Sequence, residues 1–125
     1  MTNTAYETLV FERPHEHIGV VTLKREGGFN ALNTRMGLEG VELFESFAMD
    51  AQGLRCLILT GDGDKAFCAG GDLKERNGMT PDTWRRQHEL FERQYWTLMD
   101  LSVPVIAAVN GHAYAGGLET VLACD

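Results

Sequence analysis

The chain has 125 residues, a formal net charge of −7, and 44% hydrophobic against 23% charged residues. This balance is typical of folded proteins and excludes a largely disordered chain, while the acidic charge argues against a nucleic-acid or membrane partner. The longest apolar run, residues 103–109, is too short to cross a bilayer, and no signal peptide is visible. Three cysteines without a CxxC spacing favour reduced thiols, so we expect a cytoplasmic protein.

The N-terminal part predicts a β-hairpin. Residues 6–11 and 18–23 are rich in β-branched and aromatic side chains, and a polar segment with Pro14 separates them. His15 and His17 have the alternate spacing of two metal ligands, but no third ligand is suitably spaced. We therefore expect an exposed loop there and no metal site.

A helix and a strand are expected next. Thr34 is placed to cap a helix that runs to about residue 49. Apolar residues at helical spacing predict its buried face: Leu38, Val41, Phe44 and Ala48. Residues 54–60 form an apolar run of strand length, with Cys56 in the core.

Residues 61–75 are expected to form a glycine-rich loop. Gly61, Gly63 and Ala66 fit the GxGxxA form of a dinucleotide-binding turn, but Asp62 and Asp64 would place negative charge beside a pyrophosphate. We interpret the start of the loop as a solvated turn. A nucleophilic cysteine at position 68 would need a basic partner that the sequence does not identify.

The C-terminal half predicts a helix, a strand and a second helix. Thr80 and Pro81 have the N-cap and first-turn positions of a helix, whose predicted apolar stripe is Trp84, Phe91, Tyr95 and Leu98. Residues 103–109 are apolar throughout, which is typical of a buried parallel strand. A helix then begins near residue 115. This order predicts an α/β fold with parallel crossovers.

Two segments with paired glycines, residues 66–75 and 110–119, stand out because each follows a predicted strand. Small residues there leave backbone N–H groups open, and two such groups from separate loops can stabilise negative charge on one oxygen. Glu119 lies three residues after Gly116 and is the only charged residue between Asp100 and Asp125. It either serves acid–base chemistry or simply favours the helix N-terminus, and its position leaves both readings open.

The segments AFCAGGDLKE, VPVIAAVNGHAYAGGLE and LACD, with NAL at residues 30–32, resemble the crotonase superfamily of enoyl-CoA hydratases and isomerases. The resemblance covers about residues 6–125. It is specific to the superfamily and much less so to one reaction. It implies a spiral of ββα units in which residues 1–125 are the N-terminal part of a single domain, cut before the C-terminal strands and helices.

The resemblance also implies roles for individual residues. Gly71 and Gly116 would donate the two N–H groups of an oxyanion hole, and Glu119 matches the first of two catalytic glutamates, the second lying beyond residue 125. Further positions would bind the CoA moiety together with Gly71 and Gly116: Ala31, Ala69, Gly70, Asp72 and Leu73. Asp72 has an equally good interpretation as a structural residue that fixes its loop.

The implied function is acyl-CoA chemistry of the hydratase/isomerase type in fatty acid metabolism, with a CoA thioester as substrate, no prosthetic group, and a homotrimer or dimer of trimers. Two alternatives stay open: another crotonase-type reaction, and a noncatalytic CoA-binding or subunit-interaction fragment. The chain departs from the family pattern at Glu26, Gly28 and Phe29, where proline and basic residues are usual. Lys24 or Arg25 would have to supply any contact to CoA phosphates from this loop.

Overall fold

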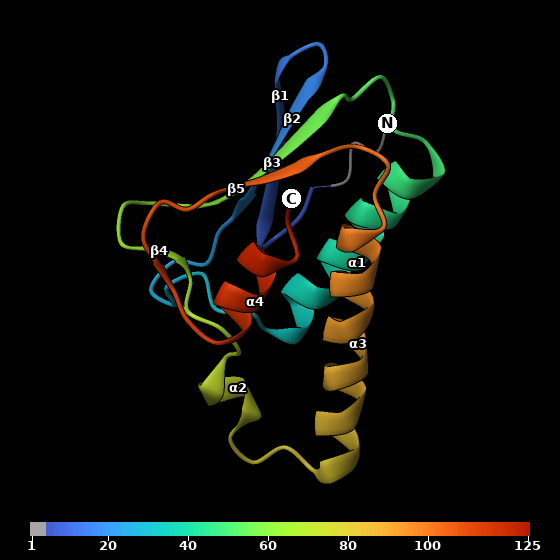
Figure 1. The fold of residues 1–125 in the computed structure, drawn as a ribbon. Coiled ribbons are helices and arrows are strands. Elements are labelled where there is room, and N and C mark those ends of the chain that lie inside the picture. Colours follow the sequence, from blue (N-terminus) through green and yellow to red (C-terminus); the bar gives the residue numbers. More distant parts are fainter. Residues whose placement is uncertain (1–4) are drawn as a thin grey trace.

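The main sheet carries the N-terminal hairpin and two parallel strands (Figure 1). The computed structural model describes residues 5–125. The elements follow one another as β1 Leu9–His15, β2 Ile18–Leu23, α1 Thr34–Met49, β3 Cys56–Gly61, β4 Ala66–Cys68, α2 Leu73–Arg76, α3 Pro81–Met99, β5 Val105–Ala108, β6 His112–Ala113 and α4 Gly116–Leu122. Strands β1, β2, β3 and β5 lie in this order, antiparallel at β1–β2 and parallel elsewhere. The predicted α/β organisation is therefore confirmed.

The hairpin forms as predicted, but its first strand begins later and runs through Pro14 to His15. Proline cannot donate a ladder hydrogen bond and is tolerated in edge strands, which is the position of β1. The pairing with β2 is irregular between Glu12 and His15, where the proline lies. The turn is consequently shorter than expected and leaves His17 as its last residue.

The interval 61–75 is not the continuous loop that the sequence predicted. It contains the three-residue strand β4, which is buried throughout, and the single-turn helix α2. Strand β4 pairs in parallel with β6 and forms a second, two-stranded sheet. Three residues are too few for a periodic pattern, and their pairing partner lies more than forty residues further along the chain. This small sheet places the two glycine segments side by side.

Helix α1 has the predicted length, but Asn33 caps it: its side-chain Oδ1 accepts a hydrogen bond of 2.9 Å from the Met36 N–H. The predicted buried face is half right, because Val41 and Phe44 are buried whereas Leu38 and Ala48 are exposed. The helix packs on α3 through glycine instead. A Cβ added at Gly37 would lie 2.9 Å from side-chain atoms of α3. A count of apolar residues overlooks such a contact surface.

Helix α3 begins as predicted, with the Thr80 hydroxyl accepting from the Thr83 N–H at 3.2 Å. Phe91 and Leu98 are buried and Tyr95 is half-buried. Trp84 is 46% exposed, contrary to prediction. It lies in the first turns of α3, which extend beyond the N-terminal end of α1 (Figure 1), and it stacks on His88 of the same helix.

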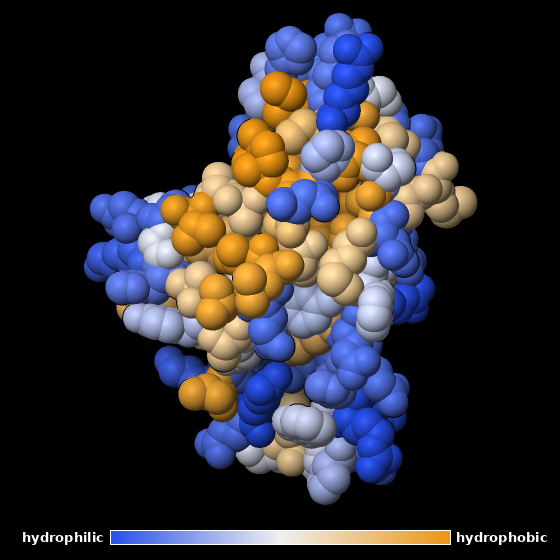
Figure 2. All heavy atoms as spheres, viewed as in Figure 1, coloured by the Kyte–Doolittle hydropathy of each residue, from blue (hydrophilic) through white to orange (hydrophobic). Residues whose placement is uncertain are grey.

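Strand β5 is parallel to β3 as predicted, but it is not buried on both faces. It forms an edge of the sheet, and Val105 is buried while Ile106 is 51% exposed. Apolar side chains gather on the face of the molecule seen in Figure 2. Within residues 5–125 no helix is long and apolar enough to span a membrane.

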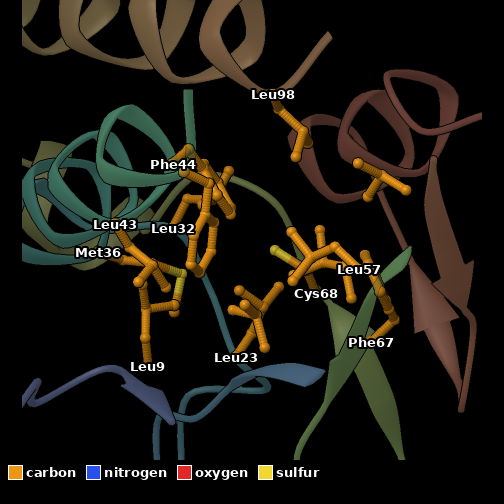
Figure 3. Packing of buried hydrophobic residues seen from close by; sticks show 14 of the residues in the cluster. Leu9, Leu23, Leu32, Met36, Leu43, Phe44, Leu57, Phe67, Cys68 and Leu98 are labelled. Atoms are coloured by element: carbon orange, nitrogen blue, oxygen red, sulfur yellow. The ribbon is translucent and has the colours of Figure 1, made fainter. Parts of the chain in front are cut away.

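The hydrophobic core lies between the main sheet, α1 and α3, and continues under β4 (Figure 3). Phe44 and Leu57 pack into it from a helix and a strand, and Phe67 and Cys68 enter from β4. Cys56, predicted as core, is only half-buried. Burial of β4 in the core fixes the start of the first glycine segment, of which β4 is a part.

Candidate active site

One cavity of about 410 Å³ brings together the three residues expected to be catalytic, Gly71, Gly116 and Glu119. Helix α3 contributes several of the lining residues. The remaining lining residues are Leu32, Arg76, His88, Phe91, Glu92, Tyr95 and Ala115. Segments far apart in sequence therefore converge on one space.

The two glycine segments are joined by backbone contacts that leave no room for side chains. The Tyr114 N–H donates to the Cys68 carbonyl at 3.1 Å. A Cβ at Gly70 would lie 2.8 Å from the Tyr114 oxygen, and its φ of +93° also favours glycine. A Cβ at Gly117 would overlap the Cys68 carbonyl oxygen. These glycines are needed for close approach of the two chains.

The N–H groups of Gly71 and Gly116 lack protein acceptors for different reasons. Leu32 bonds to the residues before and after Gly71 and not to Gly71 itself. The Leu32 N–H donates to the Gly70 carbonyl at 2.7 Å, and the Leu32 carbonyl accepts from the Asp72 N–H at 2.8 Å. Gly116 is the first residue of α4, where no earlier helical carbonyl is available. Within the described residues no group accepts a hydrogen bond from either N–H. The two residues with free N–H groups therefore line one cavity.

Ala115, which immediately precedes Gly116, has a strained backbone. Its φ of 46° and ψ of −118° are rare for a residue with a side chain, and it gives α4 no side-chain cap. Such a conformation costs on the order of 1–3 kcal/mol and persists only where the surroundings impose it. It turns the chain abruptly from β6 into α4. The sequence does not predict this conformation, because alanine rarely adopts a positive φ.

Glu119 lies in the first turn of α4 and is exposed. One of its carboxylate oxygens is 3.8 Å from the point that a Cβ on Gly116 would occupy. Among residues 5–125 no group forms a hydrogen bond or ion pair with this carboxylate. Glu119 therefore lies beside Gly116, and its carboxylate is available to a ligand.

Tyr95 fixes the peptide of Gly116. Its hydroxyl donates to the Gly116 carbonyl at 2.9 Å, and the Thr120 hydroxyl donates to the same oxygen at 2.8 Å. Burial, and to a lesser extent the charge of Glu119, raises the pKa of Tyr95, so the hydroxyl remains a donor at neutral pH. The helical spacing of Tyr95 predicted burial but not this partner.

Asp72 holds the first glycine segment, in line with its structural interpretation. One carboxylate oxygen caps α2 by accepting from the Lys74 N–H at 3.0 Å, and the other accepts from the Arg25 guanidinium at 2.9 Å. Burial alone would raise the pKa of Asp72, but these hydrogen bonds and the Arg25 charge lower it. Arg25 also donates to the Ala31 carbonyl at 3.0 Å. Its side chain is thus engaged within the protein.

The other residues expected to bind the CoA moiety do not line this cavity. Ala31 and Gly70 are buried beside it, and Ala69 is half-buried, with its N–H bonded to the Phe29 carbonyl at 3.1 Å. Leu73 is 77% exposed at the start of α2. Ala69, Gly70 and Leu73 are thus part of the first glycine segment, with Ala31 next to it, but they lie outside the cavity lining.

Asn30 is a structural residue that sequence reasoning noted only as part of a motif. It is buried with a φ of 56°, and its side-chain nitrogen donates to the Ala66 carbonyl at 2.9 Å. Its oxygen accepts from the Arg25 N–H at 3.0 Å. Asn30 thereby ties the preceding loop to the start of β4.

Two further candidates show no reactive arrangement. Burial raises the pKa of the Cys68 thiol, which keeps it protonated and a poor nucleophile. His15 and His17 lie with ring centres 6.0 Å apart. In the part of the chain that the structure describes, no three histidine, cysteine or acidic side chains are grouped to hold a metal ion.

Known proteins share this sequence and fold. Residues 13–125 match the enoyl-CoA hydratase/isomerase family. The chain is 42% identical to YngF of Bacillus subtilis over 95% of its own length and 45% of YngF. It is 40% identical to carnitinyl-CoA dehydratase of Citrobacter koseri, covering 95% of this chain and 44% of that protein.

The structural likeness is equally close. The crystal structure of an enoyl-CoA hydratase from Bacillus anthracis matches with a TM-score of 0.91 at 37% identity, over 95% of this chain and 46% of that one. The chain thus spans just under half the length of these relatives. With its α/β crotonase-like fold, the chain belongs to the enoyl-CoA hydratase/isomerase family.

Proposed function

We propose that the complete gene product is an acyl-CoA-processing enzyme of the enoyl-CoA hydratase/isomerase type. The observation that carries this proposal is the pair of free N–H groups, at Gly71 and Gly116, in one cavity with the unpaired carboxylate of Glu119. The family acts on CoA thioesters without a prosthetic group. The substrate in this proposal is accordingly an acyl-CoA thioester.

The two N–H groups act on the thioester carbonyl. Its oxygen accepts a hydrogen bond from each, and both bonds strengthen as negative charge develops in an enolate. Donors fixed before the reaction begins need no reorganisation, and losing one of them typically costs about 3 kcal/mol of barrier stabilisation. Tyr95 and Thr120 support this arrangement because they hold the carbonyl of Gly116, the residue that carries the second donor.

Glu119 acts as the acid or base. In hydration, the oxygen of water bonds to C3 of a 2-enoyl thioester, and the double-bond electrons move toward the thioester oxygen. Glu119 accepts the proton that the water loses and then delivers a proton to C2 of the enolate, which regenerates the carboxylate. In isomerisation the same carboxylate moves a proton along the acyl chain. Its exposure on the first turn of α4 supports contact with substrate.

We assign the CoA moiety to the first glycine segment itself, beyond the catalytic cavity, and to the neighbouring Ala31. Residues there with the appropriate family positions are Ala31, Ala69, Gly70, Asp72 and Leu73. Asp72 contributes mainly by holding the segment through Arg25 and α2. From the family likeness we also propose a homotrimer or a dimer of trimers.

A related reaction on the same scaffold is the second candidate. The chain resembles a protein named as a dehydratase at 40% identity and one named as a hydratase at 37%, so similarity alone favours neither direction. Dehydration reverses hydration and uses the same donors and carboxylate. Incubation with a panel of enoyl-CoA and 3-hydroxyacyl-CoA thioesters, followed by mass spectrometry of the products, distinguishes the two.

The test of the acid–base role is Glu119→Gln in the complete gene product. We expect hydration of crotonyl-CoA to slow by about 10²- to 10⁴-fold, measured by loss of ultraviolet absorbance of the conjugated thioester. Glu89→Gln, at an exposed position of α3 outside the cavity, is the matched control and should keep its rate. Turnover near that of the unmodified protein in Glu119→Gln would contradict the proposed role.

A further inference from the structure

Arg76 is the only arginine or lysine among the residues that line the proposed catalytic cavity. A Cβ placed on Gly71 would lie 2.8 Å from its guanidinium carbon and 2.9 and 3.0 Å from its two terminal nitrogens. Because the carbon is as near as the nitrogens, the guanidinium lies with its flat face on Gly71. Its N–H bonds then point along the cavity wall rather than at the glycine.

A buried amide holds the Arg76 side chain in place. Its Nε donates to the Gln87 side-chain oxygen at 3.1 Å. Gln87 is only 3% exposed, and its nitrogen donates to Glu75 at 2.7 Å and to the Thr34 hydroxyl at 3.0 Å. A guanidinium fixed through Nε presents its other two nitrogens as a preformed fork.

This fork has no partner within the protein. Arg25 and Arg93 bind carboxylates of Asp72 and Glu45. Within residues 5–125, no hydrogen-bond acceptor or carboxylate contacts the terminal nitrogens of Arg76. Paired N–H donors of this geometry match a carboxylate.

The other charged groups around the cavity leave this side open to an anion. The Glu92 carboxylate, which also lines the cavity, is engaged by His88, whose Nε2 lies 2.7 Å from Glu92 Oε1. Glu119 lies beside Gly116 on α4 and forms no ion pair with Arg76. The cavity thus has a carboxylate near one proposed oxyanion donor and an unpaired cation near the other.

We propose that this site takes short acyl-CoA thioesters whose acyl group ends in a carboxylate, bound by the two terminal nitrogens of Arg76. The inference rests on the proposed function, because the thioester held by Gly71 and Gly116 places the acyl group in this cavity. Arg76 lies against Gly71, so the carboxylate follows the thioester by only a few carbons. Arg76 is a specificity-determining residue in this scheme.

The experiment compares glutaryl-CoA with pentanoyl-CoA, which have equal chain length and differ in the terminal group. Binding to the complete gene product is measured by isothermal titration calorimetry. We expect glutaryl-CoA to bind at least tenfold more tightly. Arg76→Met should weaken the binding of glutaryl-CoA by about 10- to 100-fold and change the affinity for pentanoyl-CoA less than about threefold.

Arg85→Met is the matched control, since Arg85 is an exposed residue of α3 outside the cavity. It should leave both affinities unchanged. If Arg76→Met does not fold, as judged by circular dichroism, Arg76→Lys replaces it: it keeps the charge without the fork and should lose part of the preference.

Two results would overturn the inference. One is equal affinity of the unmodified protein for both ligands. The other is an equal loss for both ligands in the Arg76 variants, which would place the guanidinium on the shared CoA moiety. Neither saturated ligand can be hydrated, so the preference is measured even if no enoyl-CoA is turned over. Failure of the proposed function is thereby separated from failure of the carboxylate assignment.

Discussion

The two glycine segments present equivalent N–H groups but are built differently. The first, around Gly71, is held by polar side chains from distant loops, chiefly Asp72 and Arg25. The second, around Gly116, is held by hydroxyl groups on one carbonyl and by the strained turn at Ala115. The Gly71 N–H is free because Leu32 pairs with the residues on either side of Gly71. The Gly116 N–H is free because α4 begins at this residue. Similar chemistry therefore does not require similar local structure.

The largest effect is expected where the two segments touch. In Gly117→Ala the new Cβ would overlap the carbonyl oxygen of Cys68 and lie 2.7 Å from the carbonyl carbon of Cys68. Backbone cannot yield as a flexible side chain does, so we expect a loss of about 3 kcal/mol or more in the free energy of unfolding. Urea denaturation of the complete gene product measures this. Gly28→Ala, where a Cβ meets only ordinary contacts, is the control, and an equal loss there would refute the steric explanation.

The first segment is tested by pH. In Asp72→Asn the ion pair with Arg25 is lost, and we expect about 1–2 kcal/mol of destabilisation at pH 7. The folded pKa of Asp72 is lowered, so its stabilisation is fully present above the unfolded value of about 3.9 and disappears as the pH falls through the folded pKa.

Stability of the Asp72→Asn variant and the unmodified protein should consequently converge in acid, as followed by denaturant titrations at a series of pH values. Asp64→Asn, at an exposed position, serves as control. A difference that persists unchanged below the folded pKa would show that the charge of Asp72 is not its source.

The second segment should lose less stability than the first when one of its supporting hydrogen bonds is removed. Tyr95→Phe removes one of the two donors to the Gly116 carbonyl, and Thr120 still satisfies that oxygen. We expect about 0.5 kcal/mol of lost stability, less than for Asp72→Asn, and a fall in kcat of several-fold with little change in KM, measured with crotonyl-CoA. Phenylalanine fills the same space, so a loss as large as that of Asp72→Asn would mean that the two segments are supported alike.

The sequence allowed prediction of features that depend on neighbouring residues. Thr80 and Pro81 predict the start of α3 because capping is a local interaction. The family motifs assign Gly71, Gly116 and Glu119 to one site, and these residues line one cavity in the structure. Features that depend on distant partners were missed. Strand β4 exists only through its pairing with β6, and the direction of the Arg76 side chain depends on Gln87. Trp84 was misassigned because helical periodicity identifies a face and not how far the neighbouring helix extends.

The sheet of β4 and β6 has a further consequence for motion. It pairs strands of only three and two residues, which is far below the size that is stable by itself. Its backbone amides are protected from hydrogen exchange only as long as the core beneath Phe67 and Cys68 stays packed. The spacing of the two N–H donors is therefore set by the packing of the whole fold, and we expect it to be lost together with this core.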